Sequence, residues 1–295
     1  EVLAHSDLPL EDAIELHNPT VSPADVSGWF LSDELSRLKK YRIPDGTVIP
    51  AGGYRVCHEY QFNADTNLPS SFALSSAQGD DVYLSVADGN GNLTGYRTHV
   101  DFGPSANGVS FGRVVMSSGV DFAALSRRTF GVDTPSSLVE FRAGTGLSNA
   151  PPSVGPIVIS EIMYHPPPLG TNDNTLEEFI ELHNIAATPA PLFDPAHPAN
   201  TWRLRNGVDF DFPPNITLAP SSYLLLVGFD PATNATARAA FQSKYGATAR
   251  LLGPYSGKLD NGGESVKLYR PDPPQTVAGP DFGTVPYILV DRVSY

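Results

Sequence analysis

The five residues Ile-Glu-Leu-His-Asn occur twice in the chain, at 14–18 and at 180–184. A Glu and a His two positions apart are side chains that metal ions and general-base chemistry both use. A further Glu and His lie just upstream of each copy, and polar side chains from two paired strands would meet on one sheet surface. The candidate metal ligands are His5, Glu15 and His17 in the first copy and His165, Glu181 and His183 in the second.

The same spacing has a structural interpretation. Within a strand, Ile14 and Leu16 face one way while Glu15 and His17 face the other way. The apolar pair would then pack in a core, and the polar pair would form a cross-strand ladder on the outer face of the sheet. The Asn of each copy follows at the strand end, where its side chain can close a turn on its own backbone. We favour this interpretation, because an open sheet face seldom brings ligands tightly together.

Oxygen-rich loops offer a second kind of cation site. The segment 170–178 carries Asp173, Glu177 and Glu178, which are ligand types that calcium accepts, although a solvated loop is the simpler interpretation. Residues 88–92, Asp-Gly-Asn-Gly-Asn, resemble the start of a calcium loop, but Leu-Thr-Gly-Tyr follows where a later Glu ligand is needed. A β-hairpin turn explains this second segment better.

Signatures of catalysis are not found along the chain. It contains no Walker loop, no dinucleotide fingerprint and no HExxH, and no acid–base set accompanies a nucleophile. We therefore expect no enzyme activity, no catalytic residues and no cofactor, with calcium as the one ion to consider. Trp29 and Trp202 occupy equivalent places after a turn, which predicts two core anchors, with sugar stacking as the alternative.

The net charge of −13 excludes several kinds of partner. The largest basic cluster is Arg-Leu-Lys-Lys-Tyr-Arg at 37–42, so most of the surface would repel the phosphates of nucleic acids. No apolar run approaches the roughly 20 residues that span a bilayer, which argues against membrane insertion. A single cysteine, Cys57, cannot form an intrachain disulfide. The chain starts without Met and shows no signal peptide, so we interpret it as a fragment of a longer protein.

The repeat extends well beyond the five shared residues. Residues 27–31 match 200–204, and residues 41–57 match 210–226 without a gap. Short alternating segments separated by Gly, Pro and Asn predict an all-β protein of two tandem immunoglobulin-like β-sandwiches. We expect a first sandwich with a C-terminal tail over 1–145, a Pro/Gly-rich linker over 146–156, and a second sandwich over 157–295 whose last strand is missing. One inserted helix is expected at 233–246.

The blocks of the second copy resemble the lamin-tail domain of secreted bacterial proteins. The resemblance rests on Ile-Ser-Glu-Ile-Met-Tyr-His-Pro at 159–166, Glu-Phe-Ile-Glu-Leu-His-Asn at 178–184, the segment 212–227, Asn-Gly-Gly-Glu-Ser-Val-Lys-Leu at 261–268 and Val-Asp-Arg-Val-Ser-Tyr at 290–295. The first copy matches more loosely and in the same order. The resemblance implies an immunoglobulin-like sandwich that serves large exported proteins as an accessory part, and it implies no catalytic residue set.

These observations together indicate a non-enzymatic structural or interaction module. It would act as a spacer, adhesion or assembly element of a larger exported or cell-surface bacterial protein, because sandwiches carry variable loops on a rigid frame and expose edge strands. The expected partner is protein, either a second copy or other domains of the same chain. The alternative is an accessory module that binds polysaccharide or calcium for an extracellular enzyme.

Overall fold

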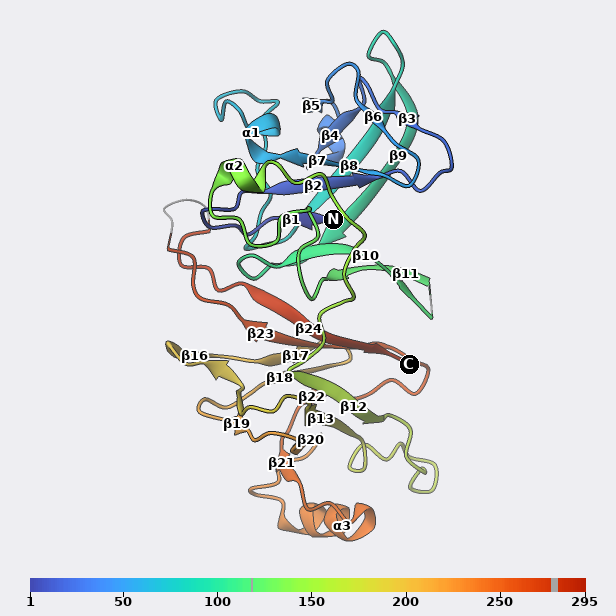
Figure 1. The fold of residues 1–295 in the computed structure, drawn as a ribbon. Coiled ribbons are helices and arrows are strands. Elements are labelled where there is room, and N and C mark those ends of the chain that lie inside the picture. Colours follow the sequence, from blue (N-terminus) through green and yellow to red (C-terminus); the bar gives the residue numbers. More distant parts are fainter. Residues whose placement is uncertain (118, 277–280) are drawn as a thin grey trace. The chain divides into compact units, whose positions relative to one another are not determined.

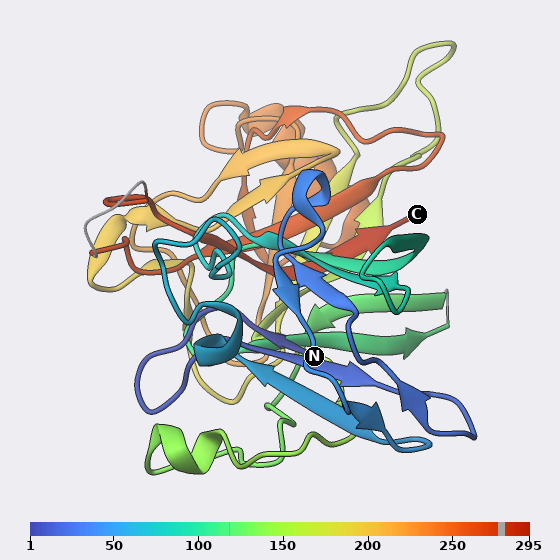
Figure 2. The same cartoon turned by 90° about the horizontal axis from the view of Figure 1, so that it is seen from above.

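The computed structural model describes residues 1–117, 119–276 and 281–295. Contacts within the chain divide it into two compact units, Glu1–Ser153 and Val154–Tyr295. Each unit consists mainly of short antiparallel strands (Figure 1 and Figure 2), which confirms the all-β, immunoglobulin-like sandwich fold. No helix of the described ranges is both long and apolar enough to cross a membrane.

Two sheets form the sandwich of the first unit. One sheet has the order β11-β10-β1-β2-β7, and the other has the order β5-β4-β8-β9. The strands of the first sheet are β1 (Val2–Leu3), β2 (Ala13–His17), β7 (Tyr54–His58), β10 (Ser110–Met116) and β11 (Gly119–Ala124). Those of the second are β4 (Phe30–Ser32), β5 (Tyr41–Arg42), β8 (Asp80–Ala87) and β9 (Leu93–Phe102), and a small ladder joins β3 (Ala24–Asp25) to β6 (Val48–Ile49).

The alternation along β2 orders the core as the sequence predicts. Ile14 is buried between the sheets with Leu31 and Phe102, whereas Glu15 points to the opposite face. The turn between β8 and β9 is a hairpin turn, as expected. The carboxylate of Asp88 accepts the backbone N–H groups of Asn90 and Asn92 at 2.9 and 2.8 Å, and these bonds close the turn.

Two sheets also form the second unit. One has the order β12-β13-β20-β21, with β21 parallel to β20, and the other has the order β22-β18-β17-β23-β24. The first comprises β12 (Ile157–Met163), β13 (Phe179–Asn184), β20 (Tyr223–Val227) and β21 (Arg250–Leu252). The second comprises β22 (Ser256–Gly257), β18 (Val208–Asp211), β17 (Arg203–Arg205), β23 (Ser265–Pro271) and β24 (Tyr287–Ser294). Two short ladders join β14 (Ala190–Pro191) to β19 (Thr217–Leu218) and β15 (Phe193–Asp194) to β16 (His197–Thr201).

The first two strands of each unit pair in the same register. In the first unit Val2 lies opposite Ile14 and Leu3 opposite Ala13. In the second unit the matching pairs are Ile162 with Ile180 and Met163 with Phe179. The repeat in the sequence is therefore a repeat in strand pairing as well.

Helical segments cover the outer face of one sheet in each unit, and they come from different parts of the chain. In the first unit α2 (Leu138–Phe141) places Phe141 against Leu3 and Val56. In the second unit the inserted helix α3 (Ala235–Tyr245) places Phe241 against Phe179. The Asn234 side chain accepts the N–H of Ala237 at 3.0 Å, and Gly246 ends the helix with φ of 62°, so the helix expected at 233–246 is confirmed. The other short helices are η1 (Leu35–Arg37) and α1 (Glu59–Phe62).

The tail of the first unit packs back on its own sheet. The backbone N–H of Leu147 donates to the carbonyl of Thr129 at 2.8 Å, and that of Ser153 donates to Ala124 at 2.7 Å. Residues 146–153, which were expected to belong to a Pro/Gly-rich linker, are thus bonded to the first unit, and the division between the units lies after Ser153.

Candidate functional site

The Asn that ends the repeated stretch has the same task in both units. The side-chain amide of Asn18 donates to the carbonyls of Ser22, Ile49 and Pro50 at 2.8, 3.1 and 3.0 Å. Its oxygen accepts the N–H of Thr20 at 3.1 Å, which is the turn on its own backbone that the sequence predicts. Asn18 itself is buried, and among its acceptors the carbonyl of Ile49 lies in a buried position that the amide satisfies.

Asn184 repeats the arrangement in the second unit. Its amide donates to the carbonyls of Thr188, Leu218 and Ala219 at 3.0, 2.9 and 3.1 Å, and its oxygen accepts the N–H of Ala186 at 3.0 Å. In each unit, one Asn therefore ties the end of the second strand to a segment more than 30 residues further along the chain.

The His of the repeated stretch also has matching surroundings in the two units. The ring of His17 stacks on Tyr54 with centroids 4.5 Å apart and 14° between the planes. The ring of His183 stacks on Tyr223 with centroids 4.2 Å apart and 9° between the planes. Each Tyr lies directly opposite its His on the neighbouring strand, so the pairs are cross-strand aromatic contacts on the outer face.

The Glu of the repeated stretch differs between the units. Glu15 is only 7% exposed, because the tail covers it, and its carboxylate accepts the N–H of Leu147 at 3.2 Å. Burial raises the pKa of Glu15 to about 8. Glu181 is half-buried and accepts the hydroxyl of Ser160 at 2.8 Å. The tail thus covers the outer face of the sheet at Glu15.

The two upstream His residues have separate neighbours. A ring nitrogen of His5 lies 2.8 Å from the carbonyl of Ser105, and His165 lies beside Tyr164 with ring centroids 6.4 Å apart. Within the ranges that the structure describes, no three His, Cys, Asp or Glu side chains gather in a way that could hold a metal ion. The two proposed Glu/His sets are consequently not brought together as ligand clusters.

A buried charged cluster in the first unit has no signal in the local sequence. Arg142 donates to both carboxylate oxygens of Glu11 at 2.7 and 2.6 Å, and a ring nitrogen of His58 lies 3.7 Å from the same carboxylate. Burial lowers the pKa of His58, because its charged form loses hydration there. Next to Glu11, Asp12 accepts the N–H of Leu74 at 3.1 Å, and burial raises its pKa to about 7. The ion pair anchors the tail beside α2, since Arg142 follows this helix directly.

The three acidic residues of the loop 170–178 have three different sets of partners. Asp173 pairs with Lys258 at 2.9 Å and accepts the amide of Asn261 at 3.2 Å. Glu177 pairs with Lys244 of α3.

The third acidic residue, Glu178, is buried. Its carboxylate accepts the N–H of Leu259 at 3.0 Å and lies 3.4 Å from the hydroxyl of Tyr255. Burial raises its pKa. The three carboxylates thus fasten the loop to α3 and to the segment around Leu259, so they do not converge on one point.

The tryptophans are parts of the cores. Trp202 is 4% exposed in the main core of the second unit, and Trp29 packs against the buried residues Val26, Ile43 and Ile49. The prediction of core anchors is confirmed for both, which removes the pair as a stacking platform for sugars.

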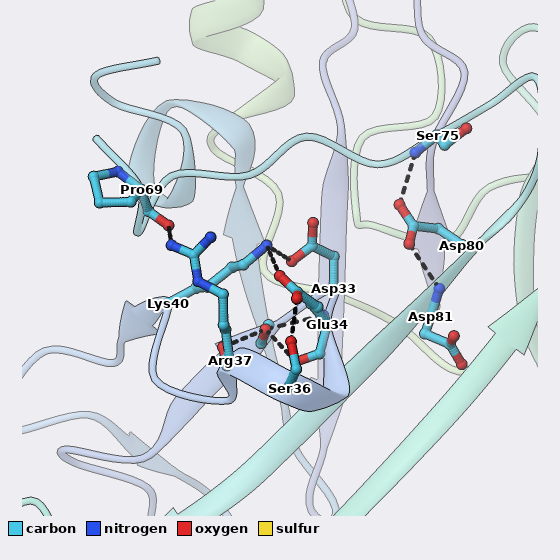
Figure 3. Close-up of polar contacts among 10 residues, drawn as sticks. Asp33, Glu34, Ser36, Arg37, Lys40, Pro69, Ser75, Asp80 and Asp81 are labelled. Carbon is cyan, nitrogen blue, oxygen red and sulfur yellow. Dashed lines mark hydrogen bonds and ion pairs between the residues drawn. The ribbon is translucent and has the colours of Figure 1, made fainter. Parts of the chain in front are cut away.

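A basic hollow lies on the first unit, where the sequence has its largest basic cluster. The hollow has a volume of about 260 Å³ and is lined by Arg37, Lys39, Lys40, Pro69 and Ser70. Figure 3 shows how its charges are used: the amine of Lys40 contacts Asp33 at 2.5 Å and Glu34 at 3.3 Å, and Arg37 donates to the carbonyl of Pro69. Two carboxylates therefore balance the charge of Lys40, whereas Arg37 is held by an uncharged carbonyl.

The carboxylate of Asp80, also drawn in Figure 3, is fixed by backbone bonds. It accepts the N–H groups of Ser75 and Asp81, each at 2.9 Å, and burial raises its pKa. Its role is to shape the start of β8.

The first unit resembles a known family of domains. Residues 1–98 match the family model of the lamin tail domain. The matched range includes β2 with Asn18 and His17, the strands β4 to β8, and most of β9. No curated protein matches the chain. The lamin-tail match connects the first unit to immunoglobulin-like structural and interaction domains, and the polar residues of its repeated stretch serve the frame.

Proposed function

We propose that the chain is a non-enzymatic interaction module of two tandem lamin-tail-like sandwiches, belonging to a larger exported or cell-surface protein, and that its partner is a polypeptide. The lamin-tail match of residues 1–98 supports this for the first unit. The shared register of β12 and β13 with β1 and β2 extends the proposal to the second unit.

The observation that carries the proposal is the long outer strand β9. It has ten residues, lies at the end of the order β5-β4-β8-β9, and exposes nearly all of its side chains between Thr94 and His99. Tyr96 is 77% exposed there. Edge strands present unpaired backbone N–H and C=O groups, and an extended segment of another polypeptide can pair with them.

A direct comparison of ligand classes tests the proposal. The 295-residue chain is immobilised and exposed in parallel to a display library of random peptides and to an array of bacterial and plant oligosaccharides. We expect enrichment of extended peptides with alternating apolar residues and no retained oligosaccharide. Retention of oligosaccharides without any enriched peptide would contradict the proposal and support a carbohydrate-binding module.

A further inference from the structure

Strands β1 and β12 pair with the next strand of their units, β2 and β13, in the same register. Their opposite edges differ, because β10 pairs with β1 whereas β12 is the outermost strand of its sheet within the described residues. In the first unit the N–H of Glu15 donates to the carbonyl of Glu1, so the Val2–Ile14 pair is of the type without direct backbone bonds. The N–H and C=O of Val2 therefore point away from β2 and towards Phe111 of β10, the residue opposite Val2 on that side.

The strand β10 also completes the core of the first unit. The ring of Phe111 is buried and lies 5.5 Å from the ring of Phe102 on β9. Ser110, opposite Leu3, is buried as well. Gly112 is restricted by the tail, because a Cβ there would approach the side chains of Asn149 and Leu125 to 2.6 and 2.8 Å. The edge of β1 thus takes a strand that places a large apolar residue opposite Val2.

The second unit presents the corresponding edge. Ile162 holds the place of Val2 in the register, and β12 is the outermost strand of its sheet within the described residues. At the far end of this edge, the carboxylate of Asp291 accepts the N–H of Ile159 at 2.7 Å. Tyr295, which aligns with Phe102, stacks on Tyr164 at a centroid distance of 4.4 Å.

We propose that the edge of β12 at Glu161–Met163 is a docking site for one extended strand of the β10 type, which pairs antiparallel to β12 and places a large apolar residue opposite Ile162. This inference rests on the proposed function and adds to the edge of β9 a second edge, in the second unit, with its own partner chemistry. The occupant follows from the first unit, where the same register carries Ser110-Phe111-Gly112. A second copy of the chain is a poorer occupant, because both copies carry a charge of −13 and Asp291 occupies part of the edge.

The test uses a fluorescent peptide with the sequence of residues 109–116, added to the 295-residue chain. Two versions carry one N-methyl group each. Methylation at the Phe111 position removes the N–H that would face Ile162. Methylation at the Gly112 position removes an N–H that points the other way, which in the first unit is the side of β11. We expect the first to lower affinity about tenfold or more, as loss of a backbone bond and the resulting clash imply, and the second to change it less than about threefold.

Hydrogen exchange locates the peptide. The amide of Ile162 should exchange more slowly with the peptide present, while that of Val2, already paired with β10, should not change. The variant Ile162→Pro should abolish binding, and the methylated peptides keep the test valid if that variant fails to fold.

The inference would be overturned by equal affinity of both methylated peptides, by protection away from β12, or by a doubled mass of the chain alone in light scattering, which would make a second copy the occupant. Enriched library peptides that protect β9 and leave β12 unprotected would overturn this inference while supporting the proposed function.

Discussion

Asn18 and Asn184 close the two units in the same way, each donating its side-chain amide to three backbone carbonyls, one close in sequence and two more than 30 residues away. Local segments and distant segments therefore meet at one side chain. Because both Asn residues belong to the repeated stretch, the repetition in the sequence reflects a requirement of the frame.

Removing one of these amides should destabilise one unit strongly. Asn184→Ala removes the side-chain donor to the carbonyl of buried Leu218 and one of the donors to the carbonyl of Ala219, and we expect a loss of about 2–4 kcal/mol in the free energy of unfolding. Denaturant unfolding followed by tryptophan fluorescence measures the loss. The exposed Asn90→Ala is the matched control and should change stability by less than about 0.5 kcal/mol. Equal effects of the two substitutions would contradict the role of Asn184.

The buried carboxyl of Glu15 should make the first unit sensitive to alkaline pH. Its pKa is raised to about 8 in the folded protein, above its ordinary value of 4.5, so folding favours the protonated form. The contribution of the protonated Glu15 carboxyl to the stability of the folded unit is fully present below about pH 4.5. It is lost as the pH rises through about 8. Glu15→Gln should therefore stabilise the unit by roughly 2–4 kcal/mol at pH 9 and bring no gain at pH 4.

Glu181→Gln, at the equivalent and less buried place, is the control for this pH dependence. Melting temperatures between pH 4 and 9 make the comparison. A gain from Glu15→Gln that is the same at both ends of the range would show that the carboxyl does not titrate as its burial requires.

The covering aromatic residues should each hold one helical segment in place. Phe141→Ala and Phe241→Ala remove rings that are almost fully buried, and we expect each to cost about 3–5 kcal/mol in its own unit. Val139→Ala, which changes an exposed side chain of α2, should cost less than about 0.5 kcal/mol. Hydrogen exchange should show early opening of α3 in Phe241→Ala and not in Phe141→Ala. Early opening of α3 in Phe141→Ala and not in Phe241→Ala would contradict the conclusion that each ring holds the helical segment of its own unit.

The acidic loop should not respond to calcium, because its carboxylates are already paired. The hydrogen bond from Lys258 lowers the pKa of Asp173, and Lys244 pairs with Glu177. We expect the same melting temperature in millimolar calcium and in chelator, and a change below about 1 kcal/mol for Asp173→Asn. A rise in melting temperature with calcium that Asp173→Asn abolishes would instead identify a cation site in this loop.

The structural features that depend on residues close together in the sequence could be predicted. The hairpin turn at Asp88, the turn at Asn18 and the helix capped by Asn234 all rest on bonds between residues two to four positions apart, and local side-chain chemistry predicts such bonds. The alternation of Ile14 and Glu15 likewise predicts which side of β2 faces the core.

Contacts between segments that are distant in the sequence could not be predicted in this way. Arg142 and Glu11 are 131 positions apart in the sequence, and Phe241 contacts Phe179 from an inserted helix. No local residue spacing predicts either contact. The candidate clusters of Glu and His were inferred from spacing alone, and the stacking partners Tyr54 and Tyr223 were missed because they lie on neighbouring strands. The shared register of the two units was predictable, since the repeated residues carry it.

The most direct measurement tests whether the repeated Glu and His have a structural role within the unit or form a binding site. The double variant Glu181→Gln/His183→Ala is compared with the unchanged chain for binding of the peptide with the sequence of residues 109–116, after its fold has been verified by circular dichroism. We expect a folded protein with an affinity within about threefold of the original, because these side chains pair with Ser160 and Tyr223 inside the unit. A folded variant that has lost the peptide would contradict this account and make the repeated stretch a binding site.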